Sequence, residues 1–110
     1  PPHGIMRLAT IEGTAVGCGT IQRLAAKDAE IKRVYISPAA RGIGAGRRIM
    51  EQLVADCRTL GFQRILMDTG RLQEAAIALY DDMGFRRRGP YQEMPLEADD
   101  IMIYFEMPLL

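Results

Sequence analysis

Hydrophobic and polar residues alternate along most of this chain with a period of two, and in two windows the spacing changes to that of a helix. Short alternating runs bounded by turn residues predict β-strands, whereas apolar residues at i, i+3 and i+4 predict α-helices. The predicted strands span residues 5–11, 15–24, 30–37, 64–68, 85–89 and 101–107, and the predicted helices span residues 44–60 and 73–83. A polar, proline-bearing loop is expected over residues 90–100.

The order of these elements, β-β-β-α-β-α-β-β, contains one strand–helix–strand unit, formed by the third and fourth strands and the helix between them. Residues 64–68 are a nearly continuous apolar run, which is typical of a buried parallel strand. The flanking strands follow through short connections and are expected to be antiparallel. The sequence predicts the α+β class (α/β in the broad sense): a mixed, mostly antiparallel sheet with one central parallel βαβ unit, in a single domain of residues 1–110.

The third predicted strand does not keep its alternation. Ile31 and Arg33 share one parity, whereas Val34 and Ile36 share the other. Because a slip of one residue turns every following side chain to the opposite face, either Ile31 lies outward or the strand contains a β-bulge at residues 32–34. We expect the bulge, and bulges are frequent beside active sites because they leave backbone groups unpaired.

The connection between this strand and the next helix is rich in glycine and arginine. It reads Arg41-Gly42-Ile43-Gly44-Ala45-Gly46, and Arg47 and Arg48 follow. Glycine accepts positive φ and lets a ligand approach the backbone closely. A helix that begins here directs unpaired N–H groups and the positive end of its dipole at the ligand. The residues therefore predict a seat for a phosphate or pyrophosphate.

Two common phosphate motifs do not fit this loop. A P-loop needs a Lys followed by Ser or Thr after its last glycine, and neither is present. A dinucleotide fold needs the spacing G-x-G-x-x-G, whereas the third glycine here is one position early and the chain is short for that fold.

The composition excludes several classes of partner. The 110 residues hold 14 basic and 14 acidic side chains, and this balance argues against broad nucleic-acid binding. Cys18 and Cys57 have no metal-ligand spacing, so no metal is expected, and two free thiols fit a reducing cytoplasm. No apolar stretch reaches the length of a membrane span. A second basic run, Arg86-Arg87-Arg88, is expected to be a solvated surface.

Two motifs together resemble a known family. Residues 29–38, followed by the glycine loop, closely resemble the acetyl-CoA motif of the Gcn5-related N-acetyltransferase (GNAT) superfamily. The second helix resembles a further family block through the residues Gln73, Ala76, Ile77, Leu79-Tyr80 and Gly84-Phe85. The resemblance covers roughly residues 5–110 and implies a GNAT-like fold that is short at the N-terminus, where the family has a further strand and two helices.

The resemblance implies acetyl-CoA as the co-substrate and assigns residues to it. The backbone of the glycine loop would bind the pyrophosphate, with Arg47 close by, through Arg41, Gly42, Ile43, Gly44, Ala45 and Gly46. The main chain of Val34, Tyr35 and Ile36 would hold the pantetheine arm as a neighbouring strand would. Gln73, at the start of the second helix, would lie near the same arm.

Acetyl transfer to an amine needs a deprotonated nucleophile, stabilised negative charge and a proton for the departing thiolate. By resemblance Tyr80 would supply that proton; the alternative is a buried tyrosine whose hydroxyl satisfies a structural partner. Glu30 stands where some members carry a general base; the alternative is an ordinary solvated glutamate at the end of a strand. His3, the single histidine, is not expected to take part.

The resemblance implies an N-acetyltransferase that moves the acetyl group by direct attack of a primary amine on a small molecule or a protein. A CoA-binding module without turnover, in a structural or interaction role, is the alternative. A third hypothesis is a nucleotide-binding interaction domain, which predicts binding of ATP or NAD in preference to CoA. The missing front elements are disordered or unsequenced, are supplied by a partner subunit, or do not exist in a minimal fold with an open acceptor side. The exposed sheet edge and uncovered apolar face predict a homodimer.

Overall fold

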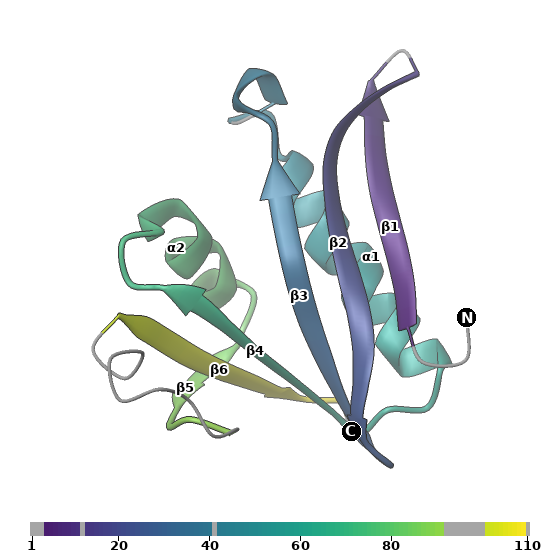
Figure 1. The fold of residues 1–110 in the computed structure, drawn as a ribbon, viewed down its shortest axis with the longest axis vertical. Helices are drawn as coiled ribbons and strands as arrows, with labels where there is room; N and C mark the ends of the chain where they lie inside the picture. Colours follow the sequence, from purple (N-terminus) through teal and green to yellow (C-terminus); the bar gives the residue numbers. More distant parts are fainter. Residues whose placement is uncertain (1–3, 12, 41, 92–100, 110) are drawn as a thin grey trace.

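The computed structural model describes residues 4–11, 13–40, 42–91 and 101–109. In these residues one six-stranded sheet has the order β1-β2-β3-β4-β6-β5 (Figure 1). The elements are β1 (Gly4–Ile11), β2 (Thr14–Ala25), β3 (Asp28–Ile36), a 3-10 helix η1 (Pro38–Ala40), α1 (Ala45–Thr59), β4 (Arg64–Gly70), α2 (Glu74–Asp82), β5 (Arg86–Arg88) and β6 (Met102–Pro108). The β3–β4 pair is parallel and the other pairs are antiparallel, so the predicted class and element order are confirmed.

Three local details differ from the prediction or extend it. Thr69 and Gly70, expected to end the fourth strand, belong to β4 because they pair with residues of β6. The short helix η1 follows β3 directly and was not predicted. From residue 92 onward the predicted loop lies outside the described residues.

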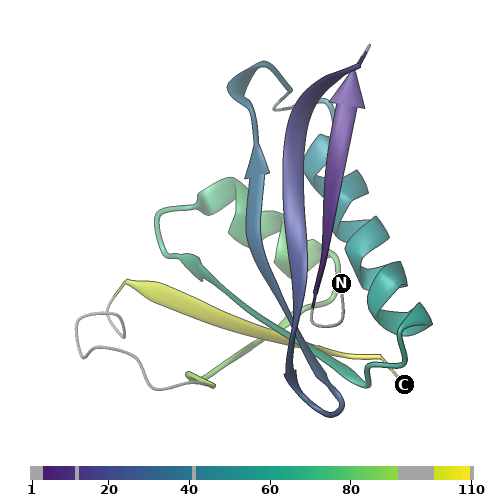
Figure 2. The same cartoon turned by 45° about the vertical axis from the view of Figure 1, so that its right-hand side comes forward.

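The sheet divides into two arms where β3 and β4 separate. Within the described residues these strands pair over residues 28–30 and 64–66, and beyond that point they diverge (Figures 1 and 2). The strands β1, β2 and β3 form one arm, and β4, β6 and β5 form the other. The gap between the arms gives the molecule an open V (Figure 1), and beyond Glu30 the edge of β3 along this V does not pair with β4.

The helix α1 packs closely on one face of the first arm (Figure 2). Glycines on β2 permit this approach, because a Cβ added to Gly17 would lie 2.8 Å from Ile49 Cδ1 and one added to Gly19 would lie 2.7 Å from Leu53 Cδ1. Residues of both helices join one core cluster with the inward side chains of β2, β3, β4 and β6. Neither helix, in the residues described, is long and apolar enough to cross a membrane.

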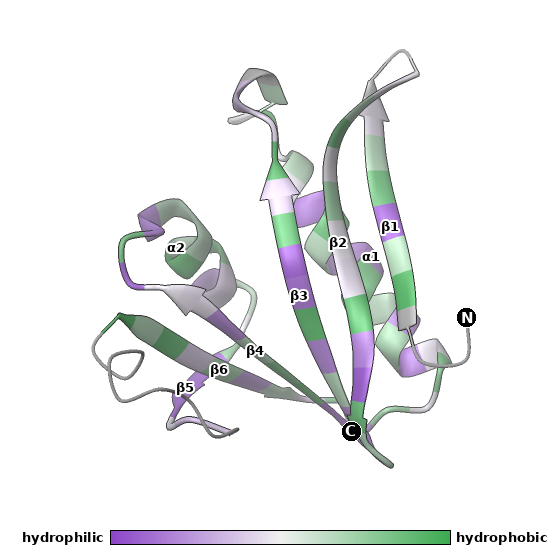
Figure 3. Cartoon of the chain, viewed as in Figure 1, coloured by the Kyte–Doolittle hydropathy of each residue, from purple (hydrophilic) through white to green (hydrophobic). Residues whose placement is uncertain are grey.

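The bulge predicted at residues 32–34 is confirmed. Cys18 pairs with Tyr35 but Thr20 pairs with Lys32, so β3 carries one residue more than β2 in this interval. Arg33 has a φ of 54°, in the left-handed region. Hydropathy alternates along β3 except at this interruption (Figure 3). The extra residue allows Ile31 before the bulge and Val34 after it to face the same core.

A methyl group at Gly17 is expected to disturb the contact between α1 and β2. Gly17→Ala should lower the free energy of unfolding by about 1–3 kcal/mol, because the new Cβ would meet Ile36, Ile49 and the carbonyl oxygen of Tyr35 within 3 Å. Urea denaturation measures the change. Gly89→Ala is the control, since a Cβ there meets no atom within 4 Å. Equal losses in the two variants would contradict the packing argument.

The ion pair between Arg7 on β1 and Asp56 on α1 should make stability depend on pH. Arg7 donates from Nε at 2.6 Å and from Nη2 at 2.8 Å, and these hydrogen bonds hold the pKa of Asp56 below its ordinary value. Because the folded pKa is depressed, the stabilisation is present at pH 7 and is lost as the pH falls below about 4. Asp56→Asn should cost on the order of 1 kcal/mol at pH 7 and much less at pH 3, measured by urea denaturation. A constant difference across this range would refute the assignment.

Candidate active site

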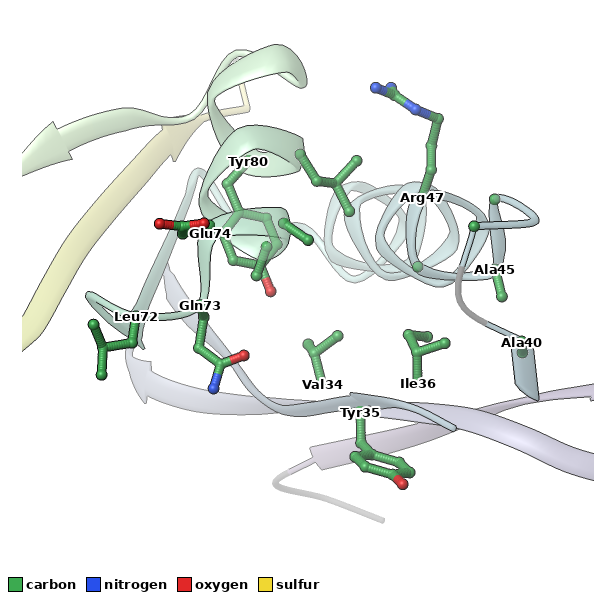
Figure 4. A pocket seen from close by; sticks show the side chains of 16 residues that line it. Val34, Tyr35, Ile36, Ala40, Ala45, Arg47, Leu72, Gln73, Glu74 and Tyr80 are labelled. Carbon is green, nitrogen blue, oxygen red and sulfur yellow. The ribbon is translucent and has the colours of Figure 1, made fainter. Parts of the chain in front are cut away.

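A pocket of about 690 Å³ lies where the two arms separate, bounded by β3 and by the N-terminal ends of both helices (Figure 4). Its lining comes from four segments of the chain: Val34, Tyr35, Ile36, Ala40, Gly42, Gly44, Ala45, Gly46, Arg47, Leu72, Gln73, Glu74, Ala75, Ala76, Leu79 and Tyr80. One cavity is therefore lined by β3, by the glycine loop and by α2.

The glycine loop gives α1 an open N-terminus. Gly42 and Gly44 have φ of 86° and 83°, which favours glycine, and Gly44 is the N-cap. A Cβ added at either position would meet no atom within 4 Å, so the space in front of the helix is free. The first turn holds Arg47 and no acidic residue. A glycine N-cap has no side chain to accept the first N–H groups, so these donors and the helix dipole can serve an anion.

The β3 edge forms one wall of the pocket. Val34 and Ile36 point toward the helices, whereas the Tyr35 side chain points away (Figure 4). Tyr35 still lines the pocket, so its contribution comes from the main chain. Beyond residue 30 this edge has no pairing with β4 among the described residues. An extended ligand can therefore bind along it as an added strand would.

Tyr80 is held rigidly at the pocket wall. The residue is 4% exposed, and its ring contacts Phe105 and Phe85 edge-on, with centroids 5.5 and 6.0 Å away. Gly84, with a φ of 96°, reverses the chain so that Phe85 can return to this ring, and the Phe85 N–H bonds the Tyr80 carbonyl. The hydroxyl points into the pocket (Figure 4) and makes no hydrogen bond with another residue that the structure describes. Burial raises the pKa of Tyr80, so the hydroxyl keeps its proton at neutral pH.

Glu30 lies on the opposite face of the sheet, because its neighbours Ala29 and Ile31 face the core. The residue is 1% exposed, so the interpretation as a solvated strand-end glutamate is wrong. The hydroxyl of Tyr91 donates a hydrogen bond of 2.6 Å to Glu30 Oε2, and Lys32 Nζ lies 3.4 Å from the same oxygen. Glu30 is not among the residues that line the pocket. Tyr80 and Glu30 thus stand on opposite faces of the sheet.

Of the remaining predicted site residues, Gln73, Ala45 and Gly46 line the pocket, and Arg47 lines it while paired with Asp82 of α2. Ile43 does not line the pocket and is 60% exposed. Arg41 lies outside the described residues.

Sequence reasoning missed two residues. Leu72 lines the pocket mouth although it is largely exposed, and Tyr91 holds Glu30. The one signal for Tyr91 was an aromatic residue at the start of a polar loop. Among the described residues, no group of three or more His, Cys, Asp or Glu side chains could bind a metal.

The sequence and the fold are similar to those of known proteins. Residues 1–85 match the sequence model of the Acetyltransferase (GNAT) family. The chain is 38% identical over 103 residues to the IAA acetyltransferase of Azospirillum brasilense, covering 93% of this chain and 66% of that protein. An N-acetyltransferase of Schizosaccharomyces pombe, uncharacterised, is 34% identical over 98 residues, covering 87% of this chain and 60% of that protein. The chain therefore spans less than two thirds of these curated relatives.

Solved structures of acyltransferases have the same fold as this chain. The crystal structure named "putative acyl-CoA N-acyltransferase" from Klebsiella pneumoniae has a TM-score of 0.86 and 36% identity, covering 100% of this chain and 76% of that chain. The paia N-acetyltransferase of Thermoplasma acidophilum, solved in complex with coenzyme A, has a TM-score of 0.82 and covers 96% of this chain and 61% of that chain. At 16% identity it shows the shared fold. The family model matches most of the chain, and a relative at 36% identity has the same fold. The chain belongs to the acetyltransferase (GNAT) family.

Proposed function

We propose that residues 1–110 form one acetyltransferase domain, which uses acetyl-CoA to acetylate a primary amine on a small molecule or a protein by direct attack. One observation carries this proposal: the same pocket is lined by the open N-terminus of α1, by the part of β3 that does not pair with β4, and by Tyr80. These are the three groups that a pyrophosphate, an extended amide-bearing arm and a departing thiolate require.

The residues present fit acetyl-CoA, which supplies an activated acyl thioester when bound. The glycine loop, Arg41 and Arg47 would hold the pyrophosphate. Main-chain groups of Val34, Tyr35 and Ile36 would bind the pantetheine amides, and Gln73 faces the same side of the pocket (Figure 4). Ile43 would contribute through its main chain alone, since the residue lies outside the lining.

The placement of Tyr80 and Glu30 supports direct attack. In direct attack the amine adds to the thioester carbonyl before the thiolate leaves, so a base beside the amine and an acid beside the sulfur serve two successive steps. Glu30 would accept the amine proton and Tyr80 would protonate the sulfur. Burial that raises the pKa of Tyr80 also raises that of a thiol in the same pocket, which keeps this proton transfer from being strongly uphill.

Two further parts of the proposal concern assembly and location. Self-association as a homodimer is supported by exposed apolar side chains on the sheet face away from α1, where Met6 is 63% and Leu8 is 59% exposed. A cytoplasmic location is supported by the two free thiols, Cys18 and Cys57.

Ligand selectivity tests the proposal directly. Calorimetric titration should show acetyl-CoA binding at least tenfold tighter than ATP or NAD, and Gly44→Ala should weaken that binding roughly fivefold, about 1 kcal/mol, through its positive φ. Gly61→Ala is the matched control, since Gly61 also has a positive φ, 87°, and open space around an added Cβ, but lies at the other end of α1 and does not line the pocket. Free thiol release is then followed with a panel of amines and, in a separate assay, with IAA, the compound in the name of the Azospirillum relative. Binding without release for any acceptor would indicate a module without turnover, and preference for ATP or NAD would reject the CoA site.

Loss of the Tyr80 hydroxyl should slow the chemical step alone. Tyr80→Phe keeps the ring contacts with Phe85 and Phe105, so kcat is expected to fall about 100-fold while the affinity for acetyl-CoA changes little. Steady-state kinetics and calorimetry measure the two quantities. Glu51→Gln, an exposed change on α1, is the control and should leave both unchanged. An unaltered kcat in Tyr80→Phe would remove Tyr80 from the mechanism.

A further inference from the structure

The contact between Tyr91 and Glu30 joins parts of the chain that are 61 residues apart. Tyr91 follows β5, and its ring meets the ring of Tyr104 on β6 edge-on, with centroids 5.9 Å apart. The guanidinium carbon of Arg88 lies 5.8 Å from the centroid of the Tyr91 ring. The second arm of the sheet therefore fixes Tyr91, and Tyr91 in turn contacts Glu30 on β3, the last β3 residue that pairs with β4.

The two oxygens of the Glu30 carboxylate differ in their surroundings. Oε2 accepts the Tyr91 hydrogen bond and also lies 3.4 Å from Lys32 Nζ. Oε1 receives no hydrogen bond from any residue that the structure describes. The Glu30 side chain is 2% exposed, so its orientation is set by these protein contacts rather than by solvent. A carboxylate held by one oxygen presents the other in a fixed direction.

We propose that Tyr91 is a positioning residue for Glu30: together with Lys32 it holds Oε2 and leaves Oε1 to receive the proton of the acceptor amine. This inference rests on the proposed acetyl transfer. In the step, the nitrogen electron pair forms the new N–C bond at the thioester carbonyl, and the amine N–H proton passes to Oε1, directly or through one water. The C–S bond then breaks, and the thiolate leaves with the proton from Tyr80. Tyr91 keeps its own proton throughout.

The surroundings of Tyr91 explain why it acts as a donor and not as a base. Burial, and then the hydrogen bond to Glu30, raise the pKa of Tyr91 far above the neutral range. The charges of Asp68 and Glu30 and the neighbouring Tyr104 act in the same direction. The hydroxyl therefore remains a hydrogen-bond donor over the working range, and a donor to a carboxylate favours the charged carboxylate.

The test compares Tyr91→Phe, Glu30→Gln, the double variant and the control Glu51→Gln in the acetylation assay across pH. Tyr91→Phe should lower kcat about tenfold with little change in the KM for acetyl-CoA, and should move the acidic limb of the kcat profile to higher pH, because the charged form of Glu30 loses a donor. Glu30→Gln should remove most of the activity and flatten that limb. The double variant should be no slower than Glu30→Gln, since both changes act through one group.

A second variant covers the case in which Tyr91→Phe does not fold. Lys32→Met removes the other contact to Oε2, and the acidic limb should move in the same direction by a smaller amount. A Tyr91→Phe or Lys32→Met profile with an unshifted limb, or losses that add to that of Glu30→Gln, would overturn the positioning role. Full activity in Glu30→Gln would overturn it while leaving acetyl transfer intact. A wild-type chain that acetylates no amine would overturn the proposed function and this inference together.

Discussion

The site depends on the separation of β3 from β4 after three paired residues. The parallel pairing stops at Glu30, and the β-bulge at residues 32–34 begins two residues later. A bulge increases the local twist of its strand, which directs the rest of β3 away from β4. If the pairing continued, β4 would occupy the edge that a ligand needs, and the pocket between the arms would close.

The same bulge also lets the core continue past the opening. Because one extra residue reverses the parity, Val34 and Ile36 face the core as Ile31 does before the bulge. The side chains of Ile36 and Ile49 then reach the position where a Cβ of Gly17 would lie, so glycine at this position keeps α1 close to the sheet. Core packing between α1 and the sheet therefore also positions the N-terminus of α1 beside the part of β3 that lines the pocket.

Much of this arrangement could be predicted from local sequence patterns. The broken alternation between Ile31 and Val34 predicted the bulge, and the glycine spacing predicted the open helix start. The contact of Tyr91 with Glu30 could not be predicted, because β4 and β6 lie between β3 and β5 in the sheet and only the path of the chain after β5 brings Tyr91 to Glu30. The alternation of side chains along β3 shows which face of the sheet Glu30 lies on, but it does not show which residues cover Glu30 there. Thr69 and Gly70 were predicted to end the strand for the same reason: their inclusion in β4 depends on pairing with β6, which lies far away in the sequence.

Among the residues that the structure describes, Glu30 differs from the paired aspartates in its partners. Asp56, Asp28 and Asp81 each receive a two-point hydrogen bond from an arginine of a different element. Glu30 instead is buried with a neutral phenol at 2.6 Å and an ammonium at 3.4 Å. Burying a charge is costly, and an apolar residue of similar volume in such a place is often neutral or stabilising. Stability therefore does not explain a glutamate at this position. A role as a base, beside the opening between β3 and β4, does explain it.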